Sequence, residues 1–366
     1  MNLQTILSRR HRRFLRRQAP AQNTSLGRMA WRRFCRNRLS VASLAVIGLF
    51  ILTALLGYLI APDHTPHCNQ QYLELATLHP GSRATFLCID PVESRGNILT
   101  GWTLPYTAIP VDSCRATADS LHAYPVAGQP FTIARDRVVK IQRRTFLLGT
   151  DAYGRDVLSM LIIGSRVSLS VGFIAILIAL LIGIALGALA AYHGGWVDNL
   201  ITWLINVVWS IPTVLLVIAI TFALGKGFWQ VFVAVGLTMW VDIARVVRGQ
   251  VYSIKEKEYI EATRALGYTT FRTIFRHILP NITGAVIVVA ASNFASAILL
   301  EAGLSFLGIG VQPPMPSWGS MVKENYSYIL LDSAYLALLP GLAIMLLVLA
   351  FMLLGNGIRD ALDIKA

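Results

Sequence analysis

The sequence predicts an all-α membrane protein with six transmembrane helices. Of its 366 residues, 55% are hydrophobic and only 14% are charged, whereas about a quarter of the residues of a soluble domain carry a charge. The apolar residues gather in runs long enough to cross a bilayer, which takes roughly 20 residues in a helix. These runs predict membrane spans at 39–61, 167–191, 200–224, 228–247, 282–304 and 334–358.

The placement of arginine predicts the orientation of these spans. Residues 1–38 contain eleven arginines and no Asp or Glu, and an apolar run follows at once. This is the pattern of a cytoplasmic arm beside a first span rather than of a nucleic-acid-binding segment. The run 39–61 is longer than the core of a cleaved signal peptide, so we expect it to be retained. With six spans, the C-terminal tail 359–366 is also predicted to be cytoplasmic.

The long segment 62–146 is then predicted to be an extracytoplasmic insertion. It carries eight Lys/Arg and seven Asp/Glu, without a positive bias, and its stretch "GQPFTIARDRVVKIQRRTFLLG" alternates apolar and polar residues as strands do. We expect a small folded unit of the α/β or β-containing kind. Three of the four cysteines lie here, so one disulfide among Cys68, Cys88 and Cys114 is expected. Their spacing matches no metal site.

The remainder, 147–358, is predicted to form a core of five spans interrupted by a loop at 248–281. That loop contains six Lys/Arg against three Asp/Glu, as a cytoplasmic loop should. Its first part reads as a short helix over 253–267, with a capping box formed by Ser253 and Glu256 and a left-handed end at Gly267. Tyr259, Ala262 and Leu266 recur along it at helical spacing.

A second helix is predicted to follow, capped by Thr269 or Thr270. Its apolar stripe consists of Phe271, Ile274, Phe275 and Ile278. Helices this short are marginal alone, so the pair needs a surface to pack on. That surface is either the protein's own bundle or a groove in a cytoplasmic partner.

The same loop carries a family resemblance. The stretch "EATRALGYTTFRTIFRHILPN" resembles the glutamate-alanine-alanine loop of permeases from binding-protein-dependent ABC importers. Five positions match that pattern: Glu261, Ala262, Gly267, Leu279 and Pro280. Thr263 and His277 replace the family's alanine and isoleucine. Residues 148–172, 192–198, 304–319 and 355–363 are similar to the second permease of dipeptide and oligopeptide importers, and the resemblance covers about three quarters of the chain.

This resemblance implies a type I ABC importer permease fold in a bacterial inner membrane. The expected partners are a homologous permease, two cytoplasmic ATPase subunits and an extracytoplasmic solute-binding protein. ATP and Mg²⁺ would be bound by the ATPases and no cofactor by this chain, which contains no phosphate-binding loop. The first helix of the loop would be the coupling helix, and the residues expected to couple are Glu258, Glu261, Ala262, Thr263, Arg264, Gly267 and Pro280.

Other polar residues have two interpretations each. The stretch before the second span contains Asp151, Arg155 and Asp156. It is either a turn that sets the angle of the span or an outer gate. The fourth span contains Asp242 and Arg245, which either form an i, i+3 pair or line a pore. The fifth span contains Asn293 and Glu301, which either line a solute path or join helices by hydrogen bonds. Trp318 lies in the proline-rich stretch "VQPPMPSWG", which we expect to be an outer loop in contact with the binding protein.

The sequence therefore favours a non-catalytic permease subunit that moves peptides by alternating access. Within transport, export or the import of another solute such as a nickel complex stays open. An intramembrane enzyme would need paired catalytic residues inside spans, and no such pair and no nucleophile motif occurs in the sequence. A membrane scaffold that transports nothing would have no use for the coupling loop.

Overall fold

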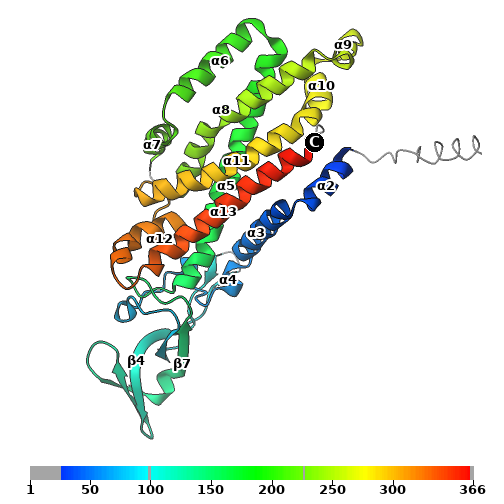
Figure 1. Ribbon diagram of the computed structural model, residues 1–366. Helices are drawn as coiled ribbons and strands as arrows, with labels where there is room; N and C mark the ends of the chain where they lie inside the picture. Colours follow the sequence, from blue (N-terminus) through cyan, green and yellow to red (C-terminus); the bar gives the residue numbers. More distant parts are fainter. Residues whose placement is uncertain (1–25, 98–99, 226, 363–366) are drawn as a thin grey trace, which may run out of the picture.

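The protein is an elongated bundle of helices with a small β-sheet unit at one end (Figure 1). The computed structural model describes residues 26–97, 100–225 and 227–362. Within these residues, five helical stretches are long and apolar enough to cross a membrane. They are Arg38–Leu55, Val157–His193, Phe228–Lys255, Thr270–Phe306 and Tyr335–Leu362.

The first two helices form the N-terminal edge of the bundle. Helix α2 (Leu26–Arg36) precedes α3 (Arg38–Leu55), and the side chain of Asn37 caps α3 by accepting from the N–H groups of Leu39 and Ser40. A short helix, α4 (Gly57–Ile60), follows. Both α2 and α3 lie along the last helix, α13 (Tyr335–Leu362), so the predicted first span packs at the side of the core.

Helix α5 (Val157–His193) is the longest element and begins ten residues before the predicted second span. The carboxylate of Asp156 caps it by accepting from the N–H of Ser159 at 2.8 Å. Helix α5 packs closely on α8 (Phe228–Lys255) because glycines face the contact. A Cβ added at Gly183 would meet Ile243 at 2.7 Å, so only glycine allows this approach.

The predicted third span is not one straight helix. It is formed by α6 (Gly195–Ser210) and α7 (Thr213–Leu224), which meet at an angle of 95°. Pro212 has no N–H to continue the helix, and it pushes the preceding Ile211 out of the helical region, to φ −90° and ψ 128°. The described residues therefore contain six candidate spans only if this bent pair counts as one.

The loop expected at 248–281 is mostly helical. Helix α8 continues to Lys255, and α9 (Glu258–Ala265), α10 (Thr270–Thr273) and a π-helical turn (Ile274–Ile278) lead into α11 (Leu279–Phe306). After α11 come α12 (Trp318–Asn325), a 3₁₀ turn (Tyr326–Leu330) and α13. In Figure 1, α9 and α10 lie at the end of the bundle opposite the β-sheet, as does the end of α13.

Residues 82–146 form the β-sheet unit. Its five antiparallel strands are ordered β6-β5-β4-β1-β7. The strands are β1 (Ser82–Ile89), β4 (Thr107–Ala116), β5 (Ser120–Pro125), β6 (Phe131–Ala134) and β7 (Val138–Phe146), and a separate pair joins β2 (Gly96–Asn97) to β3 (Gly101–Trp102). The strand content expected from the alternating pattern is therefore present in the described residues.

The expected disulfide is wrong, since all four cysteines are free thiols. The three candidates lie in separate apolar clusters. Cys68 lies in the helical core beside Tyr58 and Met160, Cys88 packs on one side of the sheet with Phe86, and Cys114 packs on the other. Because β-sheet side chains alternate between faces, thiols on opposite faces cannot meet.

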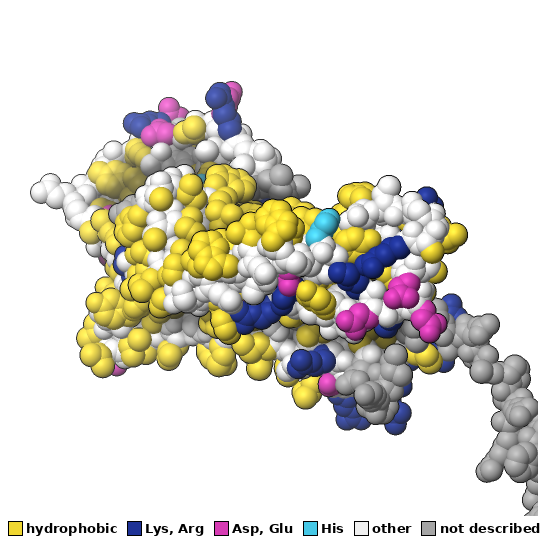
Figure 2. All heavy atoms as spheres, turned by 90° about the horizontal axis from the view of Figure 1, so that it is seen from above, with side chains coloured by type: hydrophobic (Ala, Val, Ile, Leu, Met, Phe, Trp, Pro, Cys, Tyr) yellow, Lys and Arg dark blue, Asp and Glu magenta, His cyan; other side chains and the backbone are white. Residues whose placement is uncertain are grey.

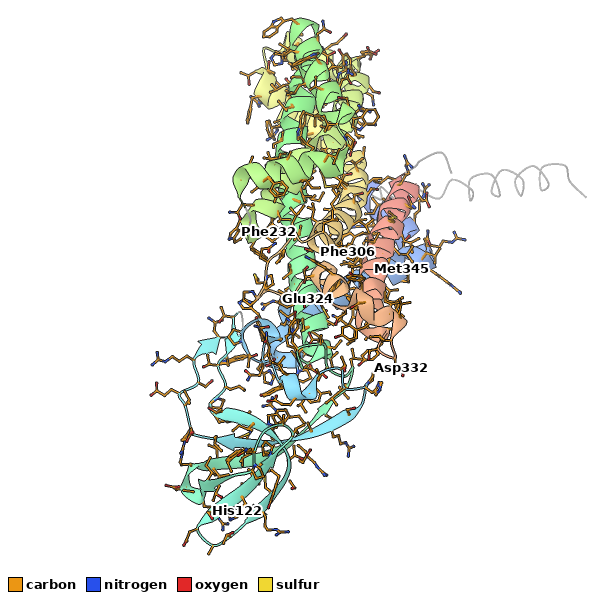
Figure 3. The ribbon with its side chains drawn as sticks, turned by 90° about the vertical axis from the view of Figure 1, so that its left-hand side faces the viewer. His122, Phe232, Phe306, Glu324, Asp332 and Met345 are labelled. Atoms are coloured by element: carbon orange, nitrogen blue, oxygen red, sulfur yellow. The ribbon has the colours of Figure 1, made fainter. Side chains whose placement is uncertain are left out.

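The segment that precedes the β-sheet unit is fastened to the bundle at the start of α5. The hydroxyl of Thr150 donates to the carbonyl of Leu75 and accepts from the N–H of Leu78, at 2.5 and 2.8 Å. The hydroxyl of Tyr335 donates to the carbonyl of Leu78 at 2.9 Å. Figure 3 shows His122 far out on this unit and Glu324 close to the junction.

Candidate functional site

Helix α9 presents one face to the bundle and the other outward. Ile260 and Thr263 are buried, and the hydroxyl of Thr263 donates to the carbonyl of Ile260 at 2.7 Å. Tyr259 and Leu266 are 42% and 71% exposed, and Ala262 is exposed between them. The predicted apolar stripe therefore points away from the bundle, whereas the buried face formed by Ile260 and Thr263 was not predicted.

The start of α9 differs from the prediction, whereas its end agrees with it. Ser253 and Glu256 do not form a capping box, because α8 continues through this stretch and α9 begins after Lys257. The end has the geometry of a Schellman motif. Gly267 stands at φ +75°, its N–H donates to the carbonyl of Arg264, and the N–H of Tyr268 donates to the carbonyl of Thr263.

The second helix adds an exposed aromatic pair to this surface. Thr269 caps α10, as predicted, by accepting from the N–H of Arg272. The expected stripe splits, because Ile274 and Ile278 are buried. Phe271 and Phe275 are 69% and 55% exposed, with ring centroids 4.2 Å apart.

The outward residues of α9, α10 and the π-helical turn lie at the same end of the molecule. We call this set of residues the α9 surface and define it by Tyr259, Glu261, Ala262, Leu266, Phe271 and Phe275. In Figure 2, charged side chains gather on the side of the molecule where Figure 1 places α9 and α10, next to hydrophobic ones. Mixed apolar and charged surfaces of this kind suit binding to another protein.

Three contacts tie α9 and its neighbours to the spans. The guanidinium of Arg264 lies 5.3 Å from the ring centroid of Tyr192, near the end of α5. Lys255 donates to the carbonyl of Ala191 at 3.1 Å. The amide of Asn281, in the first turn of α11, donates to the hydroxyl of Tyr259 at 3.4 Å. Helix α9 therefore contacts α5 through Arg264 and α11 through Tyr259, and α8 in turn contacts α5 through Lys255.

A half-buried ion pair joins α6 to α8. Arg248 donates from Nε and Nη2 to the carboxylate of Asp198 at 2.5 and 2.7 Å, and the hydroxyl of Tyr252 donates to the same carboxylate at 2.9 Å. Sequence reasoning named none of these three residues as functional. The signal available was the stretch "YHGGWVD", whose final residue is Asp198.

A pocket of about 260 Å³ lies at the bend between α6 and α7. Asp242 lines it together with Trp209, Thr238 and Ser296, and the carboxylate of Asp242 is exposed although it lies within a span. The predicted i, i+3 pair is absent from the ion pairs of the described residues, because Arg245 instead lies over the ring of Trp209 at 3.6 Å. A carboxylate in this position must face water or a partner rather than lipid.

The other two residues predicted for the solute path lie inside the bundle. Glu301 is fully buried and accepts from Ser305 at 2.7 Å and from Ser168 of α5 at 3.5 Å. Asn293 is 7% exposed, and its amide donates to the carbonyl of Met239 in α8. Neither lines the pocket of Asp242, so the structure places both as links between helices.

The residues predicted at the outer end form a buried cluster. Arg155 is 7% exposed and bonds the carboxylates of Asp151 and Glu324, at 2.6 and 2.5 Å. Burial lowers the pKa of Arg155, but the two carboxylates outweigh it and hold that pKa above its ordinary value. Because Glu324 belongs to α12, this cluster joins α12 to the turn before α5.

Trp318 was expected on an exposed loop, and the structure buries it completely. Its indole N–H donates to the carbonyl of Leu161 at 2.9 Å, and its ring lies edge-on to Phe50, with centroids 5.5 Å apart. The proline-rich stretch folds into the bundle at this point, so Trp318 offers no surface for direct contact with another protein.

Comparison with known proteins identifies the family to which this chain belongs. Residues 183–365 match the family "Binding-protein-dependent transport system inner membrane component", and residues 25–80 match the "N-terminal TM domain of oligopeptide transport permease C". The chain belongs to the family of inner-membrane components of binding-protein-dependent transport systems, and it is therefore a multi-pass permease of an ABC importer. This confirms the resemblance seen around Glu261.

Two curated relatives illustrate the similarity. The "Glutathione transport system permease protein GsiD" of Pectobacterium atrosepticum is 42% identical, over 60% of this chain and 72% of that protein. The "Dipeptide transport system permease protein DppC" of Bacillus subtilis is 42% identical, over 59% of this chain and 68% of that protein. A solved structure of the MetNI methionine ABC transporter is 21% identical over 56% of this chain and 96% of its own, with a TM-score of 0.46.

Proposed function

We propose that this chain is a non-catalytic permease subunit that imports short peptides across a bacterial cytoplasmic membrane. The relatives named for dipeptides and for glutathione support this class of substrate. The exposed Asp242 in the pocket at the bend suits it, because a peptide carries a terminal ammonium group that a carboxylate attracts. Half of the translocation path would be formed by this chain and half by a homologous permease.

The partners we propose are that second permease, two cytoplasmic ATPase subunits and an extracytoplasmic solute-binding protein. ATP and Mg²⁺ belong on the ATPases, and this chain holds no cofactor. The arginine-rich arm supports a cytoplasmic location for the end of the bundle that carries α9 and the end of α13. The β-sheet unit would then be extracytoplasmic, since it lies at the opposite end (Figure 1).

The α9 surface is the observation that carries this proposal. An apolar and acidic face turned away from the bundle, on a helix anchored from behind by Ile260 and Thr263, is the arrangement that a groove-binding helix needs. We propose that this face enters a groove in one ATPase. The closing of the ATPase pair would then move α9, and through it α5, α8 and α11.

Site-directed cross-linking tests this docking. A cysteine at Ala262 is expected to cross-link to a cysteine in the groove of the partner ATPase, with a yield that changes when ATP is added. A cysteine at His122, exposed on the β-sheet unit, is the matched control and should give no product with the ATPase. If Ala262→Cys gives no product with any co-expressed ATPase while the complex stays intact, the docking proposal is wrong.

A charge reversal gives an independent test. Glu261 is exposed, so Glu261→Arg should leave insertion and folding unchanged. Peptide uptake driven by ATP is expected to fall by about tenfold or more, because a reversed charge at a protein interface costs more than 1.4 kcal/mol. Uptake at the original rate would contradict the role of this face.

A further inference from the structure

A large apolar groove runs along the side of the bundle that faces away from the pocket of Asp242. It has a volume of about 630 Å³ and lies between α3, α5, α11 and α13. Phe294 of α11 lines it, whereas Ser296, two residues later, lines the pocket at the bend. Residues two apart on a helix point to nearly opposite sides, so the groove and the pocket open on different faces.

The walls of the groove are apolar and open to the surroundings. Leu55 of α3 is 63% exposed and Phe173 of α5 is 64% exposed, while Phe351 of α13 forms part of the floor. The rings of Phe294 and Phe351 stack there, with centroids 4.0 Å apart. These residues lie on helices that qualify as membrane spans, so the groove suits an apolar chain from the bilayer.

One cationic side chain, Arg166, lines the same groove. Its guanidinium lies 5.1 Å from the ring centroid of Tyr58, just after the end of α3. Its position is thus at the end of the groove nearer the β-sheet unit. A guanidinium has five N–H donors in a fork that matches phosphate, so an anionic phosphate can bind in addition to the contacts within the protein.

The length of the groove fits one lipid chain. Along α5, the lining extends from Arg166 to Ile174, eight residues and about 12 Å at the rise of a helix. Half of the hydrocarbon core of a bilayer is about 15 Å deep. A cation at one end and an apolar channel of this length match the headgroup phosphate and the acyl chain of one phospholipid.

We propose that this groove is a binding site for a glycerophospholipid, with its phosphate on Arg166 and one acyl chain between α3 and the core. The lipid would come from the leaflet on the side of the β-sheet unit. It would fill the space between α3 and α5 and so hold the first span against the core. This site is independent of the peptide path and of the ATPases.

Lipid titration of the purified importer complex, followed by native mass spectrometry, tests the proposal. The probe is phosphatidylglycerol added to delipidated complex, and diacylglycerol, which lacks the phosphate, is the comparison lipid. One phosphatidylglycerol is expected to bind with an affinity at least about tenfold above that of diacylglycerol. A hydrogen bond between the phosphate and Arg166 is expected to raise the affinity by about this factor. Equal binding of the two lipids would overturn the proposal.

Variants of residues in the groove test whether the lipid binds there or elsewhere on the lipid-facing surface. Arg166→Gln removes the charge, and Ser170→Trp fills the groove while keeping the arginine. Both should weaken phosphatidylglycerol binding about tenfold. Leu181→Trp is the matched control, because Leu181 is 66% exposed on the same helix and does not line the groove. Unchanged binding in both groove variants would overturn the proposal.

A second measurement distinguishes a lipid from a protein occupant. A cysteine at Ser170 should remain without a cross-link to the partner permease in native membranes, and it should react with a lipid that carries a thiol-reactive group in its acyl chain. A cross-link between Ser170→Cys and a helix of the partner permease would show that the groove is a subunit interface and would overturn the lipid assignment.

Discussion

The ion pair between Asp198 and Arg248 offers the sharpest test of how the end of the bundle near α9 is held together. The carboxylate of Asp198 accepts two hydrogen bonds from the guanidinium of Arg248 and one from the hydroxyl of Tyr252. Asp198→Asn removes this carboxylate and leaves the guanidinium in place. Hydrogen bonds to charged groups are worth about 1.5–3 kcal/mol each. The side chain of Arg248 is 32% exposed, so solvent screening reduces the strength of these hydrogen bonds. We therefore expect a coupling free energy between Asp198 and Arg248 of about 1–2 kcal/mol.

A double-mutant cycle measures this coupling directly. The free energy of unfolding is compared for the unchanged protein, Asp198→Asn, Arg248→Gln and the double variant, by equilibrium unfolding in mixed micelles. The β-sheet unit provides the matched control. Arg137 donates to both carboxylate oxygens of Asp90, each at 2.7 Å, but this pair is exposed. The control pair should show a much smaller coupling.

Two outcomes would refute the reasoning. A coupling between Asp198 and Arg248 no larger than that of the exposed control pair would show that burial adds nothing here. Loss of ATP-driven uptake in Asp198→Asn, with an unchanged free energy of unfolding, would show that the carboxylate acts in transport and not in holding α6 to α8. We expect the two effects to appear together, because Tyr252 and Lys255 continue from this pair toward α9.

The remaining predictions concern positions where the backbone or the core leaves no room. Gly267→Val places a β-branched residue at φ +75° and should abolish uptake while the protein still inserts, whereas Gly249→Ala, with open space around it, should transport normally. Gly183→Val should lower the yield and thermal stability of the purified protein, because the new Cβ meets Ile243 at 2.7 Å. Trp318→Ala should cost about 3–5 kcal/mol of stability, and an unchanged melting temperature would contradict its buried position.

The sequence predicted the features that depend on local chemistry. The apolar runs located the spans, and the turn at Gly267 and the cap at Thr269 followed from residue types with strong positional preferences. The bend of the third span was also within reach, since Pro212 interrupts the run. The bend was not predicted because the apolar run has the length of a single span. Hydropathy depends on the length and composition of a run and not on whether the helix is continuous.

Features that depend on tertiary packing could not be predicted in the same way. Helix α9 has apolar residues on both faces, and only the surrounding structure decides that Ile260 is buried and Leu266 exposed. The loop around Trp318 looked exposed because it is rich in proline, yet a large aromatic ring fills a space beside Gly164. Glu301 looked like a pore residue because charge in a span is costly, and hydrogen bonds from two serines satisfy it inside the bundle instead.

Helix α5 connects the two ends of the molecule on which function is proposed to depend. Its 37 residues extend about 55 Å, longer than the hydrocarbon core, so both ends lie outside it. At one end Tyr192 lies under the guanidinium of Arg264 of α9, and at the other Asp156 caps the helix beside the cluster of Arg155. Between these ends, α5 packs closely on α8 at Gly183. We expect a shift imposed at α9 to reach the junction with the β-sheet unit through this helix.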